Sequence, residues 1–500
     1  MASFVGSGQQ ARAVEELVAR LSSSSSGFAV APAVSFRSSA DSGVGIYAKE
    51  SVKKGAVLVQ IPFDQCLSAE AVTASPGLRV VFEEQEQLAA FPDEVLAIGL
   101  MYGMLRMREQ QAAAADAARS RELETACPWL AHVKTLPPPE SFNTTLFWSD
   151  DELAQLKGCS VFHLTQLMKR QIDADWESVH AQLAQVYPEL LGGATKDLYA
   201  WALSIVYSRA LGFTRRGAPV RVIAPVLDMA NHDPHAARDS ADTFSFADDE
   251  DAVRLLAAQD LSAGDECSAV YGRYPNSKLA YTYGFVVHGN PVQAVDLWAR
   301  VPASSFAAER KRQLLQGNAL TAQQNYDFSG TLRGGGWVSP ALLATIRVIQ
   351  IADEAELAAA EAAAEAAEEE GDEAVQSSTK RLGPFLQSIS VRNEAAMLGS
   401  LTALLTARLA VEAAEADRLR LGELLLDGPG AEQGVGVGDG GGGGGGVSRE
   451  FQALVIRVEE REVVRECLAA VRGWAAELER LGEAYEAPDA RLLAAVGGTL

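Results

Sequence analysis

The hydrophobic pattern of this chain changes twice in its first three hundred residues, and this change most constrains the fold. In residues 28–62, short apolar runs are separated by glycine and serine, which predicts β-hairpins. Residues 69–210 carry a helical pattern, and short β-like runs return in residues 220–287. Because two blocks of short strands flank a helical block, we predict one β-rich domain, residues 28–290, with a helical insert at about 69–210.

Two local signals fix helices on either side of the first strands. An amphipathic stretch at residues 11–21 predicts a short N-terminal helix, so residues 1–27 are interpreted as a helix and a linker. Two acidic residues in this stretch are unusual for a plastid transit peptide. Within the insert, Ser149 is followed three residues later by Glu152, a spacing that predicts a capping box at a helix start.

The second half of the chain is rich in alanine and leucine and predicts an all-α domain at residues 300–490. Two segments within it are expected to be flexible. Residues 353–373 are a run of glutamate and alanine, which could also form a solvated helix without an apolar face. Residues 434–446 contain seven consecutive glycines and predict a loop.

Composition limits the possible partners. The 500 residues are 48% hydrophobic, which predicts two or three domains. A formal charge of −23 disfavours nucleic acid and anionic membranes, and favours a partner with a basic segment. No apolar run approaches the roughly 20 residues needed to span a bilayer. The five cysteines include no CxxC pair, which argues against disulfides and a thiolate zinc site and favours a reducing compartment.

Three segments carry groups that could serve chemistry, and each has a plainer interpretation. Gly43-Val44-Gly45 lies among strands and could be a tight turn. The cluster from Asp228 to His235 follows an apolar run; it could be a surface turn or, less favourably, a metal site, since its spacing matches no zinc pattern. The third segment holds Gly-Asp-Glu, then Tyr271 beside a glycine, then Tyr283-Gly-Phe, and such tyrosines are often core aromatics.

Together and in this order, the three segments resemble a SET-domain methyltransferase. The resemblance extends to the plant Rubisco large-subunit lysine methyltransferase subfamily through PWLAHVKTLPPPESFNTTLFWSDDELAQLKG, SRAL and LAYTYGF. It covers residues 10–300 closely and the helical half more loosely, where NEAAM and VIRVEEREVV fit that family's substrate-binding domain. It implies an α+β protein: a β-rich, pseudoknotted SET fold with a helical insert, followed by an all-α substrate-binding domain, without the zinc cluster of other SET subfamilies.

The resemblance also implies an activity and its residues. The expected reaction moves a methyl group from S-adenosylmethionine to a protein lysine. Free lysine, with a pKa of about 10.4, is mostly protonated at neutral pH, a penalty on the order of 4 kcal/mol, which an apolar channel lined by tyrosines lowers. The catalytic residues are then Tyr283 and Tyr271. The cofactor-binding residues are Ser42, Gly43, Val44, Arg209, Asn231 and His232, and the substrate-binding residues are Asp228 and Ser208.

Some positions depart from the pattern of the subfamily. Phe213 stands where the best-known plant relatives have an arginine, and Phe244 or Phe246 could replace a cofactor-stacking tyrosine. A histidine methyltransferase of the same fold, a catalytically silent SET module that binds proteins, and a helical scaffold with an unrelated β domain remain as alternatives. We expect a monomer in chloroplast or cytoplasm, acting on Rubisco large subunit, aldolase or another lysine-bearing protein.

Overall fold

The structure is a computed structural model of the whole chain. It describes residues 7–24, 27–39, 43–113, 115–237, 241, 243–317, 327–333, 337–369, 385, 387–409, 414–427 and 448–487. The chain divides into two compact units. The first contains Met1–Gln155, Val161–Pro291 and Leu425–Ala453, and the second contains Leu156–Ser160, Val292–Leu424 and Leu454–Leu500.

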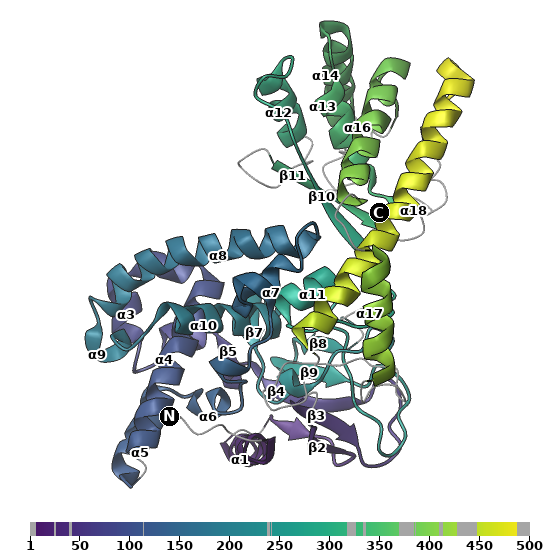
Figure 1. Cartoon of the computed structure of the whole chain (residues 1–500). Coiled ribbons are helices and arrows are strands. Elements are labelled where there is room, and N and C mark those ends of the chain that lie inside the picture. The colour runs from purple at the N-terminus through teal and green to yellow at the C-terminus, as the bar shows by residue number, and fades with distance from the viewer. Residues whose placement is uncertain are drawn as a thin grey trace. The chain divides into compact units, whose positions relative to one another are not determined.

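The strands of the first unit come from both sides of the helical insert (Figure 1). One sheet has the strand order β1 (Ala29–Val30), β4 (Val57–Pro62), β9 (Ala252–Leu256), β8 (Phe244–Ala247). A hairpin joins β2 (Val34–Ser39) and β3 (Gly43–Ala48). A third sheet has the strand order β5 (Leu67–Ser68), β7 (Ala218–Ile223), β6 (Ala210–Arg215). Because β4 pairs with β9 and β5 pairs with β7, the two β blocks form one domain, which confirms the prediction from the change of pattern.

The expected helices of the insert are present. They are α2 (Ala69–Thr73), α3 (Arg79–Glu84), α4 (Pro92–Ala112), α5 (Ala117–Ala126), α6 (Leu130–Val133), α7 (Asp150–Ala154), α8 (Ser160–Val179), α9 (Pro188–Leu191) and α10 (Lys196–Arg209). Helix α4 is buried along most of its length, and Gly99 and Gly103 leave room for Val72 and Trp129 against it. The capping box of Ser149 and Glu152 at the start of α7 is confirmed.

Helix α1 (Ser7–Ser24) packs on the hairpin of β2 and β3. Its Val14, Leu17 and Leu21 are buried, and this spacing places them on one helical face. The amphipathic N-terminal helix predicted from the sequence is therefore part of the fold.

The segment after β9 lies between two distant parts of the first unit. On one side it meets β3, because the Cys267 N–H donates to the Ile46 carbonyl at 2.7 Å. On the other side Ala269 forms a parallel bridge with His232. The segment from Cys267 to Ala269 therefore lies between β3 and the Asn-His segment.

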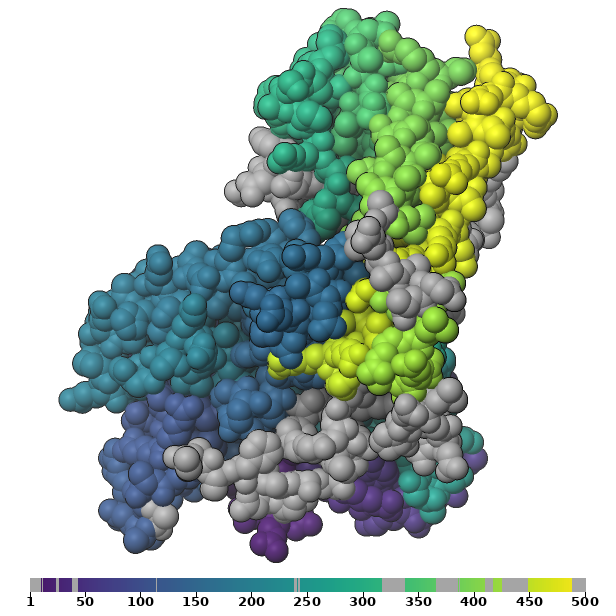
Figure 2. Space-filling model, viewed as in Figure 1, coloured from purple at the N-terminus to yellow at the C-terminus, as the bar shows by residue number. Residues whose placement is uncertain are grey.

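The second unit is mainly helical, and α13 packs against α16 and α12. Figure 2 shows one face of the surface that the described residues form. Its helices are α12 (Ala308–Gly317), α13 (Pro340–Gln350), α14 (Glu354–Glu369), α16 (Val391–Leu409), most of α17 (Ala414–Asp427) and most of α18 (Arg449–Leu481). None of the helices in the described ranges is long and apolar enough to cross a membrane.

Two features of the second unit differ from the expectation of a purely helical domain. A three-stranded sheet joins β10 (Ala294–Arg300), β11 (Asp327–Arg333) and β12 (Trp337–Val338). β10 and β11 pair across a long connection, and β12 has only two residues, so local sequence did not reveal this sheet.

The glutamate and alanine run also differs from the expectation of a flexible segment. Residues 354–369 form helix α14, and Leu357, Ala360 and Ala364 are buried in the core of the second unit. These three residues form a narrow apolar face that the many exposed alanines concealed. Residues 370–373 and the glycine run at 434–446 lie outside the described residues.

A buried ion pair lies in the core of the second unit. Arg347 of α13 and Glu394 of α16 are both fully buried, and two hydrogen bonds of 2.7 and 2.9 Å join them. The guanidinium also donates to the Phe385 carbonyl at 2.8 Å, and the Asn393 amide donates to the Arg347 carbonyl. The NEAAM motif thus supplies two residues that hold α13 and α16 together.

We predict that Arg347→Met lowers the free energy of unfolding by about 3–5 kcal/mol, because it leaves Glu394 buried without its charge partner. Denaturant unfolding of the full chain measures this loss. The double variant Arg347→Met/Glu394→Leu removes both charges and should regain most of the stability. A double variant that is no more stable than the single one would contradict this interpretation.

Candidate functional site

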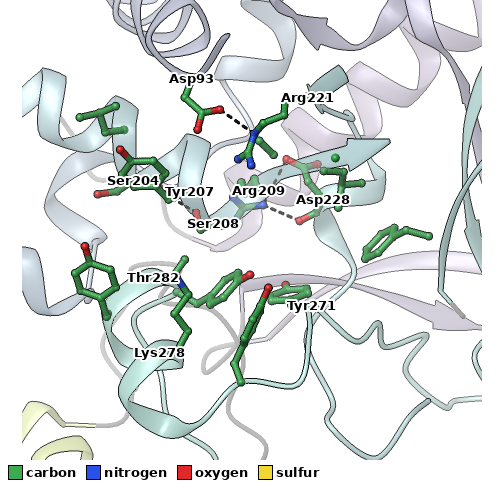
Figure 3. Close-up of a pocket in the computed structure, with 18 of the residues that line it drawn as sticks. Asp93, Ser204, Tyr207, Ser208, Arg209, Arg221, Asp228, Tyr271, Lys278 and Thr282 are labelled. Carbon is green, nitrogen blue, oxygen red and sulfur yellow. Dashed lines mark hydrogen bonds and ion pairs between the residues drawn. The ribbon is translucent and has the colours of Figure 1, made fainter. Parts of the chain in front are cut away.

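A cavity of about 760 Å³ opens in the first unit, lined by α10, η6 (Leu227–Met229), β6 and α11 (Asn276–Thr282). Figure 3 shows Arg209 and Asp228 directed toward one another within it, with the Asp93–Arg221 ion pair beyond them. Of the residues predicted for the site, those that line the cavity are Ser208, Arg209, Asp228, Tyr271 and Tyr283.

Asp228 reaches the cavity through a strained turn. Val226, the residue before η6, is buried and has a φ of 72°, a conformation that β-branched residues rarely adopt. Arg209 holds the turn from α10, because its guanidinium donates to the Asp228 carbonyl at 2.6 Å and lies 3.4 Å from the carboxylate. The turn therefore has a fixed position at the cavity wall.

The Asp228 carboxylate is buried but charged. Burial acts to raise its pKa, yet His132 and Arg209 together hold the pKa below its ordinary value. The His132 Nε2 lies 3.0 Å from Asp228 Oδ2. The second oxygen, Oδ1, is buried and has no hydrogen-bond partner among the described residues. Asp228 is therefore a charged carboxylate held in the cavity wall by His132 and Arg209.

Asn231 and His232 lie next to the tyrosines, although they are far from them in sequence. The Ala269 N–H donates to the Asn231 carbonyl at 2.8 Å, and the Tyr271 N–H donates to His232 Nδ1 at 3.1 Å. Burial lowers the pKa of His232 to about 4, so the ring is neutral at physiological pH. The ring is thus a fixed hydrogen-bond acceptor rather than a titrating group.

The glycine motif contacts the Asn-His segment at Gly45. The Asn231 amide donates to Glu266 Oε1 at 2.7 Å, and a Cβ on Gly45 would lie 2.6 Å from that same oxygen. Glycine at this position therefore allows the Asn231–Glu266 pair to lie against β3. Burial raises the pKa of Glu266 in spite of hydrogen bonds from Asn231 and Tyr47.

The tyrosines form one aromatic cluster. The rings of Tyr271 and Tyr283 lie 4.9 Å apart, and Tyr274 and Phe285 each lie 6.1 Å from Tyr283. The Tyr271 hydroxyl donates to the Ala230 carbonyl at 2.9 Å. The cluster thus connects the last motif to the segment that carries Asn231, as the sequence analysis predicted for one shared site.

The remaining predicted positions have varied surroundings. Phe213 and Phe244 line the cavity, whereas Phe246 packs on Phe213 at 5.9 Å. Ser208 donates its hydroxyl to the Ser204 carbonyl at 2.7 Å. Gly43 and Val44 lie in β3, and Ser42 lies outside the described residues.

Two polar partners of the site were not predicted from the sequence. They are His132, the partner of Asp228, and Glu266, the partner of Asn231. Both stand in motifs that carried the resemblance, so a search for buried polar residues within those motifs could have found them.

In the described ranges, no group of three or more histidine, cysteine, aspartate or glutamate side chains could hold a metal ion.

Known structures share this fold. A crystal structure of the SET domain of LSMT bound to lysine and AdoHcy matches with a TM-score of 0.69 and 19% identity, over 94% of this chain and 93% of that chain. A structure of Rubisco LSMT bound to AdoMet matches with a TM-score of 0.67 over the same shares. This chain therefore shares the fold of these solved structures.

Sequence comparisons narrow this class. Residues 302–464 match the Rubisco LSMT substrate-binding family. The [fructose-bisphosphate aldolase]-lysine N-methyltransferase of Arabidopsis thaliana is 25% identical over 57% of this chain and 55% of its own length. The Rubisco large-subunit N-methyltransferase of Nicotiana tabacum is 21% identical over 62% and 58%. The chain is therefore similar to proteins of the Rubisco LSMT type, and it spans little more than half the length of these relatives.

We predict that His232 makes stability depend on pH. Its pKa falls from 6.5 in the unfolded chain to about 4 in the folded one, so the folded state resists protonation. The resulting stabilisation, about 3 kcal/mol, is complete above the unfolded pKa and is lost as pH falls toward the folded pKa. Denaturant unfolding at about pH 7.5 and pH 4.5 measures it.

The matched variant His232→Gln keeps an acceptor for the Tyr271 N–H but cannot titrate. It should lose less stability between the two pH values than the parent chain does. His180→Gln, outside the cavity, serves as the control. If His232→Gln and the parent chain showed the same pH dependence, the buried neutral ring would be ruled out.

Proposed function

We propose that this protein transfers a methyl group from S-adenosylmethionine to the ε-amine of a lysine in another protein. The observation that carries the proposal is the contact of Tyr271 and Tyr283, 4.9 Å apart, beside the Asn231–His232 segment at a cavity that also holds Asp228. The names of the relatives, a lysine N-methyltransferase of aldolase and an N-methyltransferase of the Rubisco large subunit, support the same chemistry.

The aromatic cluster suits the binding of an uncharged amine. Rings of Tyr271, Tyr274 and Tyr283 replace water around a lysine side chain, and such an environment disfavours the ammonium form. The phenol hydroxyls can accept or donate a hydrogen bond and so orient the nitrogen lone pair. The enzyme then needs alignment of two reactants rather than a strong base.

Asp228 gives the cavity a means to attract the acceptor. A protonated lysine is a cation, and Asp228 lines the cavity with a carboxylate that stays charged. We propose that this carboxylate draws the ammonium toward the tyrosines, where the proton is released to solvent before transfer. Arg209 and His132 keep Asp228 charged throughout.

The polar groups near the tyrosines fit the methyl donor. Its amino-acid end carries a carboxylate, which Arg209 and Asn231 are suited to bind, and an ammonium, which backbone carbonyls of Ser42, Gly43 and Val44 are suited to accept. His232, neutral and buried, offers its backbone to the adenine. When bound, the donor supplies an electrophilic methyl group.

The acceptor protein is proposed by class only. The matched substrate-binding family at residues 302–464 and the charge of −23 favour a protein with an exposed lysine in a basic surface. Rubisco large subunit, fructose-bisphosphate aldolase and ribosomal proteins appear in the names of relatives. They are the acceptors to test first, together with plastid and cytosolic extracts.

We predict that Tyr283→Phe and Tyr271→Phe each lower methyl transfer by roughly 100-fold, because each loses a hydroxyl placed at the reacting groups. The assay measures label passed from tritiated S-adenosylmethionine to the acceptors named above. Tyr102→Phe removes a phenol outside the cavity and should keep nearly full activity.

Analysis of the labelled amino acid separates two reactions of this fold. Methyllysine supports the proposal, and methylhistidine would instead establish the histidine alternative. Equal labelling by the parent chain and both cavity variants would remove the tyrosines from the mechanism.

We further predict that Asn231→Leu weakens binding of S-adenosylhomocysteine by roughly 10-fold or more, because it removes a polar side chain and releases Glu266 from its partner. Isothermal titration calorimetry measures the Kd. Ser204→Ala, which removes a hydroxyl bonded to the Ala200 carbonyl within α10, should stay within about 2-fold of the parent chain. Unchanged affinity in Asn231→Leu would exclude this residue from the cofactor site.

A further inference from the structure

The turn that follows α11 sets the position of Tyr283. Tyr283 ends the helix, and Gly284 has a φ of +85°, a conformation that favours glycine. A Cβ on Gly284 would lie 2.8 Å from the Thr144 nitrogen and 2.9 Å from the Asn143 carbonyl carbon. The Tyr-Gly-Phe turn is therefore in close contact with the backbone of residues 143–144.

Arg449, the first residue of α18, contacts the side chain of Asn143. The Arg449 Nε donates to Asn143 Oδ1 at 2.9 Å, and its Nη1 donates to Glu152 Oε2 at 2.8 Å. Although burial acts to raise it, hydrogen bonds from Ser149 and Arg449 lower the pKa of Glu152. Glu152, which caps α7, therefore also binds Arg449 of α18 beside Asn143, whose backbone contacts the Gly284 turn.

Gln452 contacts the turn directly. Its side chain is buried, with 1% exposure, and its Nε2 donates to the Gly284 carbonyl at 3.2 Å. Gln452 lies three residues after Arg449, so both side chains project from one face of α18. One face of α18 therefore bonds both the Gly284 carbonyl and the Asn143 side chain.

We propose that Gln452 and Arg449 are positioning residues that set Tyr283 for methyl transfer. Both lie within residues 302–464, the part matched to the substrate-binding family, so this part of the chain contributes to the catalytic pocket itself. The inference rests on the proposed function. Tyr283 packs between Tyr271 and Tyr274, so a shift of the neighbouring carbonyl displaces its hydroxyl from the reacting atoms.

The main test is Gln452→Met, which keeps the length of the side chain but removes the donor. We expect kcat for methyl transfer to the small probe Nα-acetyl-lysine amide to fall by roughly 10- to 100-fold, the range for a misplaced reactive group. The Kd for S-adenosylhomocysteine should stay within about 2-fold. The small probe occupies the lysine channel alone, so it reports the pocket rather than recognition of a protein surface.

Gln110→Met is the matched control. Gln110 is another buried glutamine, and its amide bonds Ser120 and Glu124 away from the cavity. Thermal unfolding of both variants corrects for lost stability. An equal fall of kcat in both variants, or a change in Gln452→Met confined to KM for a protein acceptor, would overturn the proposal.

Two further measurements keep the test decisive. If Gln452→Met fails to fold, Arg449→Met replaces it, because it alters a partly exposed side chain. We expect Arg449→Met to lower kcat as well. Fluorotyrosine at position 283 reports its surroundings by NMR without any turnover. A shift in the Gln452 variant and none in the Gln110 variant supports the positioning role even if no acceptor is methylated, and an unchanged signal in both counts against it.

Discussion

The site depends on the short parallel pairing of the Asn-His segment with Ala269. Two hydrogen bonds carry it: Ala269 N–H to the Asn231 carbonyl at 2.8 Å and Asp233 N–H to the Ala269 carbonyl at 3.0 Å. The same segment meets β3 through Cys267. Because it is paired on both sides, its continuation places Tyr271 against His232, where the Tyr271 N–H donates to His232 Nδ1 at 3.1 Å.

Charge is the second constraint on the cavity. Asp228 is buried, and a buried carboxylate without partners would take up a proton. His132 from the insert and Arg209 from the end of α10 prevent this. The helical insert is therefore more than a cover for the sheets, because it supplies both partners that keep the acceptor charged. The strain at Val226 is tolerated for the same reason: the turn is fixed from several directions.

Features of the fold could be predicted from the sequence where the local hydrophobic pattern and a recognisable motif agreed. The grouping of Tyr271 with Tyr283 followed from the resemblance to a known family. The return of β-like runs after the insert and the capping box at Ser149 could be read from residue types and spacing. The sheet of β10 to β12 could not, since its pairing joins strands with a long connection and little local signal. Helix α14 was misjudged because three small or aliphatic residues, among many exposed alanines, are enough to bury one face.

The contacts of α18 explain why the site could not be completed from its motifs. Tyr283 is identified by its neighbours in sequence, but its position is set by Gly284, and the Gly284 carbonyl is held by Gln452, which lies 168 residues later. Nothing in the residues around Gln452 marks it as part of a pocket, since a buried glutamine in a helix is ordinarily structural. A sequence motif identifies the side chain that takes part in the chemistry. The contacts that hold this group in place come from whichever element the fold brings to it, and here that element belongs to the part of the chain matched to the substrate-binding family.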